Sequence, residues 1–202
     1  MRIVAGEFRG RTIDAPEGDG TRPTTDRVRE ALMSSLYSML GGFEDQSVLD
    51  AFAGSGALGL EALSRGARHA DFFESSKAAY RTLRANISAC RVGSERASAY
   101  NADVLRAFAA TEGAVRSASG APYTLVFMDP PYALGARAAA SFADGLQNAG
   151  ALADDAVIVY EHDWKFARDV SEAFGGWDIM SDRKYGKTGI ALLRIREEGV
   201  QA

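Results

Sequence analysis

The stretch Ser47–Gly59, SVLDAFAGSGALG, constrains the fold of this chain most. Its first half is a short apolar run, typical of a buried strand, that stops at Asp50. Its second half turns through Gly54, Gly56 and Gly59. Glycine lets the backbone turn tightly and approach a ligand closely, where a side chain would not. The stretch therefore predicts a strand, a ligand-binding turn and the start of a helix.

The glycine turn alone leaves two ligands open. Gly54–Gly59 reads G-x-G-x-x-G, and Glu74 lies twenty residues beyond Gly54, where a nicotinamide-binding fold has its ribose acid. The same turn is typical of enzymes that bind an adenosyl cofactor. Motifs elsewhere in the sequence are needed to distinguish a nicotinamide-dependent dehydrogenase from an enzyme with an adenosyl cofactor.

Strand and helix patterns alternate after the turn. The expected strands are Ser47–Ala51, His69–Glu74, Ala97–Tyr100, Tyr123–Met128 and Ala156–Tyr160. The expected helices are Ala57–Arg65, Ser76–Cys90, Val104–Ala110, Gly135–Asn148 and about Phe166–Phe174. This rhythm indicates a parallel, doubly wound α/β sheet. Two last strands, about Trp177–Lys184 and Gly189–Ile195, have too short a link for a crossover helix, so they pair antiparallel. A seven-stranded, mostly parallel sheet with a C-terminal hairpin resembles the Rossmann-like class I methyltransferase architecture.

The N-terminal part precedes this core. Residues 2–13 hold two short alternating runs, which suggest a small hairpin or an irregular extended arm, a small β extension of the sheet protein. A turn-rich loop follows from Asp14 to Thr24, and a helix runs from Thr25 or Asp26 to Leu40, before Gly41-Gly42. With 202 residues, 47% of them hydrophobic, we expect one domain: an arm and loop over 1–24, and the helix with the core over 25–202.

Acidic residues follow four successive strands, at the edge where doubly wound sheets bind ligands. Each acid by itself is also typical of a helix cap or turn. We expect Glu74 to accept both ribose hydroxyls, and Asp103 to accept from an adenine amine beside the backbone of Ala102 or Val104. Asp50 is placed to hold the N–H groups of the turn or a cationic amino group. A site rich in carboxylates and without basic residues to bind phosphate fits S-adenosylmethionine, which has no phosphate, better than it fits a pyrophosphate.

Asp129-Pro130-Pro131-Tyr132 follows the fourth strand and distinguishes the two ligands. Two prolines stiffen the turn and leave carbonyl oxygens free to face the site. An exocyclic base amine is a poor nucleophile; hydrogen bonds to the Asp129 carboxylate and the Pro130 carbonyl favour a pyramidal nitrogen with an available lone pair. Tyr132 offers a flat face for a flipped-out base. The motif predicts methylation of an amine; a purely structural turn is the alternative.

DAFAGSGALG, Glu74, Asn101-Ala102-Asp103 and DPPY together resemble the S-adenosylmethionine-dependent amino-methyltransferases of nucleic-acid bases. RIVAGEFRGRTI, RPTTDRVREAL from Arg22, and RKYGKT from Arg183 resemble, more narrowly, the bacterial family that methylates N2 of a guanine in 16S ribosomal RNA. Where the family commonly has Ala-Leu-Phe-Asn, this chain has Ala31-Leu32-Met33-Ser34. The resemblance implies catalytic roles for Asp129, Pro130 and Tyr132. It implies cofactor binding by Asp50, Ala53, Gly54, Ser55, Gly56, Glu74, Ser75, Ala102, Asp103, Val104 and Asp129.

The charge pattern fits an RNA partner on one face, although the net charge is −4. The candidate RNA-binding residues are Arg2, Arg9, Arg11, Arg22, Arg27, Arg183 and Tyr185. Ordinary solvated faces are the alternative for these side chains, and Arg22-Pro-Thr is also placed to cover the cofactor. We expect 16S rRNA, within a 30S subunit or an assembly intermediate, as the partner of a monomer. DPPY also occurs in adenine-N6 enzymes, so a DNA methyltransferase, like a noncatalytic RNA-binding module, is an alternative.

Other features exclude further classes. The single cysteine, Cys90, has no partner for an internal disulfide, and His69 and His162 lack metal-ligand spacing, so we expect no metal and structural roles for all three. The N-terminus lacks the apolar block of a signal peptide, and no run is long enough to span a membrane. These features predict a cytoplasmic protein.

Overall fold

A computed structural model describes residues 1–16, 26–109 and 120–196 of the chain. Its strands are β1 (Ser47–Asp50), β2 (His69–Phe73), β3 (Ala97–Tyr100), β4 (Tyr123–Met128), β5 (Leu152–Asp163), β6 (Trp177–Tyr185) and β7 (Thr188–Ile195). Its α-helices are α1 (Asp26–Leu40), α2 (Ala57–Ser64), α3 (Lys77–Ala89), α4 (Val104–Ala109), α5 (Gly135–Asn148) and α6 (Ala167–Ala173). Two short 3₁₀ helices, η1 (Tyr132–Leu134) and η2 (Trp164–Phe166), precede α5 and α6.

The strands form one sheet in the order β3-β2-β1-β4-β5-β7-β6. The first five strands in the chain pair in parallel, and β7 pairs antiparallel with both β5 and β6. The predicted fold class, a mostly parallel seven-stranded sheet with a C-terminal hairpin, is therefore confirmed. Because β1 lies between β2 and β4, the chain leaves β1 toward one edge of the sheet and later returns to its other side.

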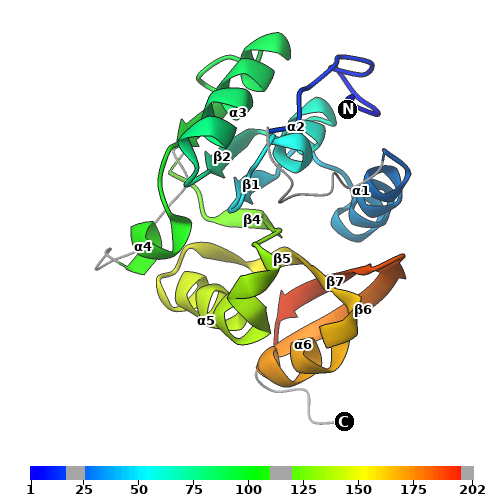
Figure 1. Ribbon diagram of the computed structural model, residues 1–202, viewed down its shortest axis with the longest axis vertical. Coiled ribbons are helices and arrows are strands. Elements are labelled where there is room, and N and C mark those ends of the chain that lie inside the picture. The colour runs from blue at the N-terminus through cyan, green and yellow to red at the C-terminus, as the bar shows by residue number, and fades with distance from the viewer. Residues whose placement is uncertain (17–25, 110–119, 197–202) are drawn as a thin grey trace.

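Helices cover both faces of the sheet (Figure 1). Neighbouring strand residues point to opposite faces: Val48 packs in a core with residues of α1, α2 and α3, and Leu49 in a second core with residues of α4, α5 and α6. The same alternation separates Leu125 from Val126 on β4. Two buried faces explain why the strands read as continuous apolar runs rather than as alternating ones.

The N-terminal arm, residues 1–14, is irregular rather than a regular hairpin. A single antiparallel bridge joins Arg2 to Thr12, and Met1 N donates to Ile13 O at 3.0 Å. Ile3, Phe8 and Ile13 are fully buried, so the arm belongs to the core on the α1–α3 face. Gly6 and Gly10 both have positive φ, which breaks the strand pattern between these anchors.

Some element boundaries differ from the sequence prediction. β5 begins at Leu152 and ends at Asp163, well beyond the predicted Ala156–Tyr160. Leu152 pairs with Tyr123 of β4 before a register shift, and the polar last residues pair with β7. The helical stretch predicted over Phe166–Phe174 is η2 followed by α6. Thr25, residues 17–24 of the predicted loop and the predicted helix end at Ala110 lie outside the described residues.

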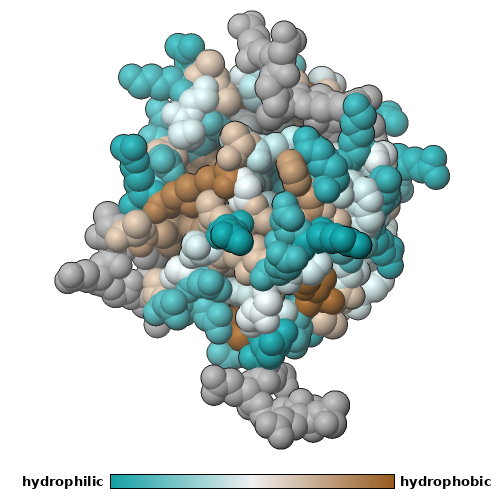
Figure 2. Space-filling view, turned by 60° about the horizontal axis from the view of Figure 1, so that its bottom comes forward, coloured by the Kyte–Doolittle hydropathy of each residue, from teal (hydrophilic) through white to brown (hydrophobic). Residues whose placement is uncertain are grey.

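The surface visible in Figure 2 is mostly hydrophilic, with hydrophobic residues confined to separate areas between polar side chains. Large exposed apolar side chains in the described ranges include Tyr132 and Phe166. None of the described helices is long and apolar enough to cross a membrane.

Gly59 of α2 provides a test of the packing between helix and sheet. A Cβ there would lie 2.3 Å from Cε1 of Phe72, whereas a Cβ on Gly145 of α5 would meet nothing within 4 Å. We expect Gly59→Ala to lower the free energy of unfolding in urea by about 1–3 kcal/mol. Gly145→Ala, the control, should raise it by about 0.5–1 kcal/mol. Equal effects of the two substitutions would contradict this packing.

Candidate functional site

The predicted site residues meet at one edge of the sheet. β1, β2, β3 and β4 run parallel, so Asp50, Glu74, Asn101 and Asp129 follow strand ends on the same edge. The strand order reverses beside β1, which is the position at which doubly wound sheets bind ligands. The arrangement of the four strand ends was predicted from the sequence.

The glycine turn is held open by a neighbouring carboxylate. Gly54 N donates to Glu74 Oε2 at 2.9 Å, and Ser76 N donates to Glu74 Oε1 at 2.7 Å. Gly54 and Gly56 have φ of 53° and 79°, in the left-handed region. A Cβ on Gly54 would meet nothing within 4 Å, so the turn faces open space. Each Glu74 oxygen has a further lone pair with which to accept a ligand hydroxyl.

Asp50 accepts a hydrogen bond from a backbone N–H of the glycine-rich stretch, one of the two roles predicted for it. Its Oδ2 accepts from Gly59 N at 3.0 Å, and it therefore holds the first turn of α2, whereas Glu74 holds the N–H of Gly54. Burial raises the pKa of Asp50 to about 7; the Gly59 N–H lowers it in part, and the charges of Asp129 and Glu74 raise it further. Three carboxylates thus act on one another at this edge.

Asp129 is a partly exposed acid whose carboxylate has no hydrogen-bond partner among the described residues. Burial raises the pKa of its carboxyl to about 6. No donor in the described ranges forms a hydrogen bond with its carboxylate, and Pro130, which follows it, is buried. The carboxylate oxygens are therefore able to accept hydrogen bonds from a bound molecule.

The third strand end is organised by local hydrogen bonds. Asn101 Nδ2 donates to the carbonyl oxygens of Glu74 and Ser75 at 2.8 and 3.2 Å. Asp103 Oδ1 accepts from Leu105 N at 3.0 Å and caps α4, which was the alternative role for this acid. Asp103 stays exposed, and Val104 is buried behind it.

The charge and shape of the edge fit an adenosyl cofactor with a cationic sulfonium. A cation among Asp50, Glu74 and Asp129 would be stabilised by all three carboxylates. A pyrophosphate would be repelled by the same charges, which counts against the dinucleotide interpretation of G-x-G-x-x-G. Gly59 also has a packing role, against Phe72, rather than a role toward a ligand. The described residues contain no group of three or more His, Cys, Asp or Glu that could hold a metal ion.

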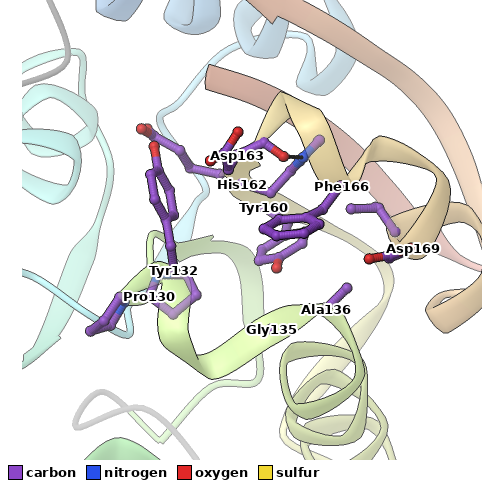
Figure 3. A pocket seen from close by; sticks show the side chains of 12 residues that line it. Pro130, Tyr132, Gly135, Ala136, Tyr160, His162, Asp163, Phe166 and Asp169 are labelled. Atoms are coloured by element: carbon purple, nitrogen blue, oxygen red, sulfur yellow. Dashed lines mark hydrogen bonds between the residues drawn. The ribbon is translucent and has the colours of Figure 1, made fainter. Parts of the chain in front are cut away.

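A cavity of about 150 Å³ lies beyond the prolines of DPPY. In Figure 3, Tyr132 stands on one side of it, with Tyr160 and Phe166 on the other. Tyr132 is 51% exposed and Phe166 44% exposed. Asp169 of α6 also lines the cavity (Figure 3). Sequence reasoning identified only the DPPY side of this cavity.

β5 and η2 supply the side that was missed. Glu161, His162 and Asp163 line the cavity at the end of β5. His162 is buried, stacks on Tyr160 with ring centroids 5.6 Å apart, and has Nε2 3.0 Å from Oδ1 of Asp182. His162 thus lies at the candidate site as well as having structural contacts. The available signal was the polar Glu-His-Asp sequence at the carboxyl end of an apolar strand.

The candidate RNA-binding residues fall into two regions. On the arm, Arg9 is exposed, Arg2 pairs with Asp26 at 3.4 Å, and Arg11 donates to the carbonyl oxygen of Cys90. Arg27 is exposed on α1, and Arg22 lies outside the described residues.

The other region is the hairpin of β6 and β7. Arg183 is exposed, whereas Tyr185 is half-buried against the core. Burial raises the pKa of the Tyr132 hydroxyl, and a hydrogen bond with Thr188 lowers it in part. Since Thr188 pairs with Tyr185, the hairpin tip lies beside DPPY. The structure thus places the tip of the hairpin beside Tyr132, while Arg183 and Tyr185 themselves do not line the cavity.

Comparisons with known proteins cover nearly the whole chain. The family model described as "Conserved hypothetical protein 95" matches residues 1–194. "Ribosomal RNA small subunit methyltransferase D" of Escherichia coli (strain K12) is 35% identical over 199 residues, 98% of this chain and 92% of that protein. "Putative rRNA methyltransferase YlbH" of Bacillus subtilis (strain 168) is 36% identical over 200 residues, 97% of this chain and 100% of that protein.

A solved structure is similar over the same extent. "Putative methyltransferase yhhF from Escherichia coli" has a TM-score of 0.78 and 34% sequence identity, and the match covers 96% of this chain and 97% of that one. The arm, α1 and the terminal hairpin therefore fall within the range that is shared with the relatives.

The raised pKa of Asp129 predicts an effect on stability. Its folded pKa of about 6 exceeds the value of about 3.9 in an unfolded chain, so the wild type loses stability as pH rises from about 4 through 6. Asn carries no charge at any of these pH values. We expect Asp129→Asn to leave stability unchanged near pH 4 and to raise the free energy of unfolding at pH 8 by about 1–3 kcal/mol.

Urea denaturation at the two pH values would measure this difference. Asp45→Asn is the matched control, because the Asp45 side chain is 89% exposed and its removal should change stability little at either pH. Equal stability of wild type and Asp129→Asn at pH 8 would show that burial does not raise this pKa.

Proposed function

Because the chain belongs to the family described as conserved hypothetical protein 95, we propose that it transfers a methyl group to the exocyclic N2 amine of one guanine in 16S ribosomal RNA. It is a methyltransferase whose cofactor is S-adenosylmethionine. The ribosomal RNA substrate comes from the relatives named ribosomal RNA methyltransferases. The base and the atom come from the resemblance of both chain ends to the guanine-N2 family.

The cofactor residues in this proposal lie around the glycine turn. The backbone of Ala53, Gly54, Ser55 and Gly56 would line the cofactor, Glu74 and Ser75 its ribose, and Ala102, Asp103 and Val104 its adenine. Asp50 and Asp129 would lie nearest to its positive charge. The cofactor supplies an electrophilic methyl group carried on a sulfonium. The open space at Gly54 supports this placement, because any side chain there would intrude on the ligand.

The unpartnered carboxylate of Asp129 is the observation that carries the proposal. A base amine has two N–H donors, and the Asp129 carboxylate and the Pro130 carbonyl oxygen would accept one each. Both hydrogen bonds hold the nitrogen in one place and draw its lone pair out of the ring. When the nitrogen gains the methyl group it loses one proton, and an acid with a pKa near 6 can take up that proton and pass it to water.

The cavity beside DPPY would take the base. A cavity of about 150 Å³ holds a ring of the size of benzene in other proteins, and this one opens toward Tyr132. The exposed ring of Tyr132 would stack on the base, and Phe166 faces it across the cavity (Figure 3). A base that is flipped out of the RNA can reach such a site, whereas a stacked base cannot.

The basic residues of the two regions would hold the RNA backbone. Arg183 lies on the hairpin of β6 and β7, and Arg2, Arg9, Arg11 and Arg27 lie on the arm and α1. We propose the hairpin, with Arg183 and Tyr185, as the part nearest the target nucleotide, and the arm as a contact with neighbouring RNA. Assembled 30S particles present such extended surfaces better than short oligonucleotides do.

Methylation by purified protein tests the function. With labelled S-adenosylmethionine and undermethylated 30S particles or naked 16S rRNA, we expect label in one N2-methylguanosine after digestion. Asp129→Ala should reduce the rate about 100- to 1,000-fold at a cofactor concentration that saturates the variant, because Asp129 also lies near the positive charge of the cofactor. Asp45→Ala, at an exposed position, should remain as active as the wild type.

Two results would count against the proposal. Absence of label in both RNA substrates, or label in adenine alone, would refute the guanine-N2 assignment. Full activity of Asp129→Ala would refute the role of the carboxylate.

A further inference from the structure

Asn86, on α3, joins three separate parts of the molecule. It is 2% exposed. Its Nδ2 donates to the carbonyl oxygen of Ser55 at 2.9 Å and to that of Asp14 at 2.9 Å. Its Oδ1 accepts from Asp14 N at 2.8 Å. One buried carboxamide therefore links the cofactor turn, the end of the N-terminal arm and a helix of the core.

Ser55 lies between the two glycines of the turn. Gly54 and Gly56 have left-handed φ values, and glycine gives the backbone little conformational restraint of its own. The hydrogen bond from Asn86 fixes the direction of the Ser55 carbonyl and with it the peptide that leads into Gly56. The turn thus depends on a contact from outside for part of its shape.

The start of the arm reaches the same residue. Met1 Sδ lies 3.8 Å from Ser55 Oγ, and Arg29 of α1 donates to Met1 Sδ at 3.4 Å and to Arg2 O at 2.7 Å. Ser55, a predicted cofactor residue, is itself buried and contacts the arm through its side chain. Both ends of the arm therefore meet at the cofactor turn.

The rest of the arm is fixed on α2. Val4 N donates to Glu61 Oε1 at 2.6 Å, Phe8 N donates to Ser64 Oγ at 2.9 Å, and Ser64 Oγ donates to Ala5 O at 2.5 Å. These contacts involve the far end of α2, not the turn that precedes the helix. They hold the arm without acting on the turn.

We propose that Asn86 is a positioning residue for cofactor binding. Through Asn86 the N-terminal arm helps to fix the shape of the turn that binds the cofactor. Asn86 cannot touch the cofactor, because it is buried and all its donors and its acceptor are engaged with the chain. Its action is on the Ser55 peptide and on Asp14. The inference rests on the proposed function only in that the turn binds S-adenosylmethionine.

Calorimetry with S-adenosylmethionine on the full-length protein tests the inference. Asn86→Ala leaves two carbonyl groups and one N–H without their partner, and we expect Kd to rise about 10- to 100-fold. In the methylation assay, KM for the cofactor should rise in parallel, while kcat at saturating cofactor stays within about 3-fold of the wild type. This split separates positioning of the turn from general damage.

Ser64→Ala is the matched control. It removes a buried side chain whose two hydrogen bonds also go to the arm, so its Tm should fall by a similar amount, but its Kd should stay that of the wild type. Asp14→Pro removes the N–H that Asn86 accepts, at an exposed position, and should raise Kd several-fold even if Asn86→Ala folds poorly.

The outcomes distinguish this inference from the proposed function. Failure of the wild type to bind S-adenosylmethionine would refute the cofactor assignment itself. A wild type that binds, with Kd unchanged in Asn86→Ala or in Asp14→Pro, would overturn the positioning role. An equal rise of Kd in Ser64→Ala would also overturn it, because the effect would then come from loosening the arm in general.

Discussion

Parallel pairing of β1 with β2 on one side and with β4 on the other is the interaction on which the site depends. It places the end of β1 between two other strand ends, so residues far apart in the sequence reach one edge. Asp50, Glu74 and Asp129 are close enough there for the latter two to raise the pKa of the first. Removing carboxylates from water costs free energy. Burial of apolar side chains in the two hydrophobic cores of the sheet offsets this cost.

Two acids of this sheet, one on β2 and one directly after β4, differ in whether their carboxylate oxygens have partners within the protein. Asp71 on β2 is fully buried, with His69 Nε2 3.2 Å from one oxygen and Tyr123 donating to the other at 2.9 Å. Asp129 directly follows β4, the neighbour of β1 in the sheet. Its carboxylate accepts no hydrogen bond from the described parts of the chain. A satisfied acid stabilises one arrangement of strands, whereas an unsatisfied one is available to a ligand.

The sequence allowed the sheet, its hairpin and the DPPY side of the site to be predicted, because each leaves a local signal. Val48-Leu49 before three glycines, and two prolines after Asp129, are such signals. The other side of the cavity could not be found in this way, since Tyr160 looks like a core residue of β5 and Phe166 like the start of a helix. The role of Asn86 has no local signal in the sequence either. It is one polar residue in an amphipathic helix, and its partners are 31 and 72 residues away.

The seating of the arm on α2 and α3 has a consequence for the order of folding during synthesis. The arm is synthesised before its partners Glu61, Ser64 and Asn86, which follow 56 to 72 residues later. The buried Ile3, Phe8 and Ile13 must therefore wait in the nascent chain until α3 has emerged. Until then the apolar side chains of the arm have no core in which to be buried.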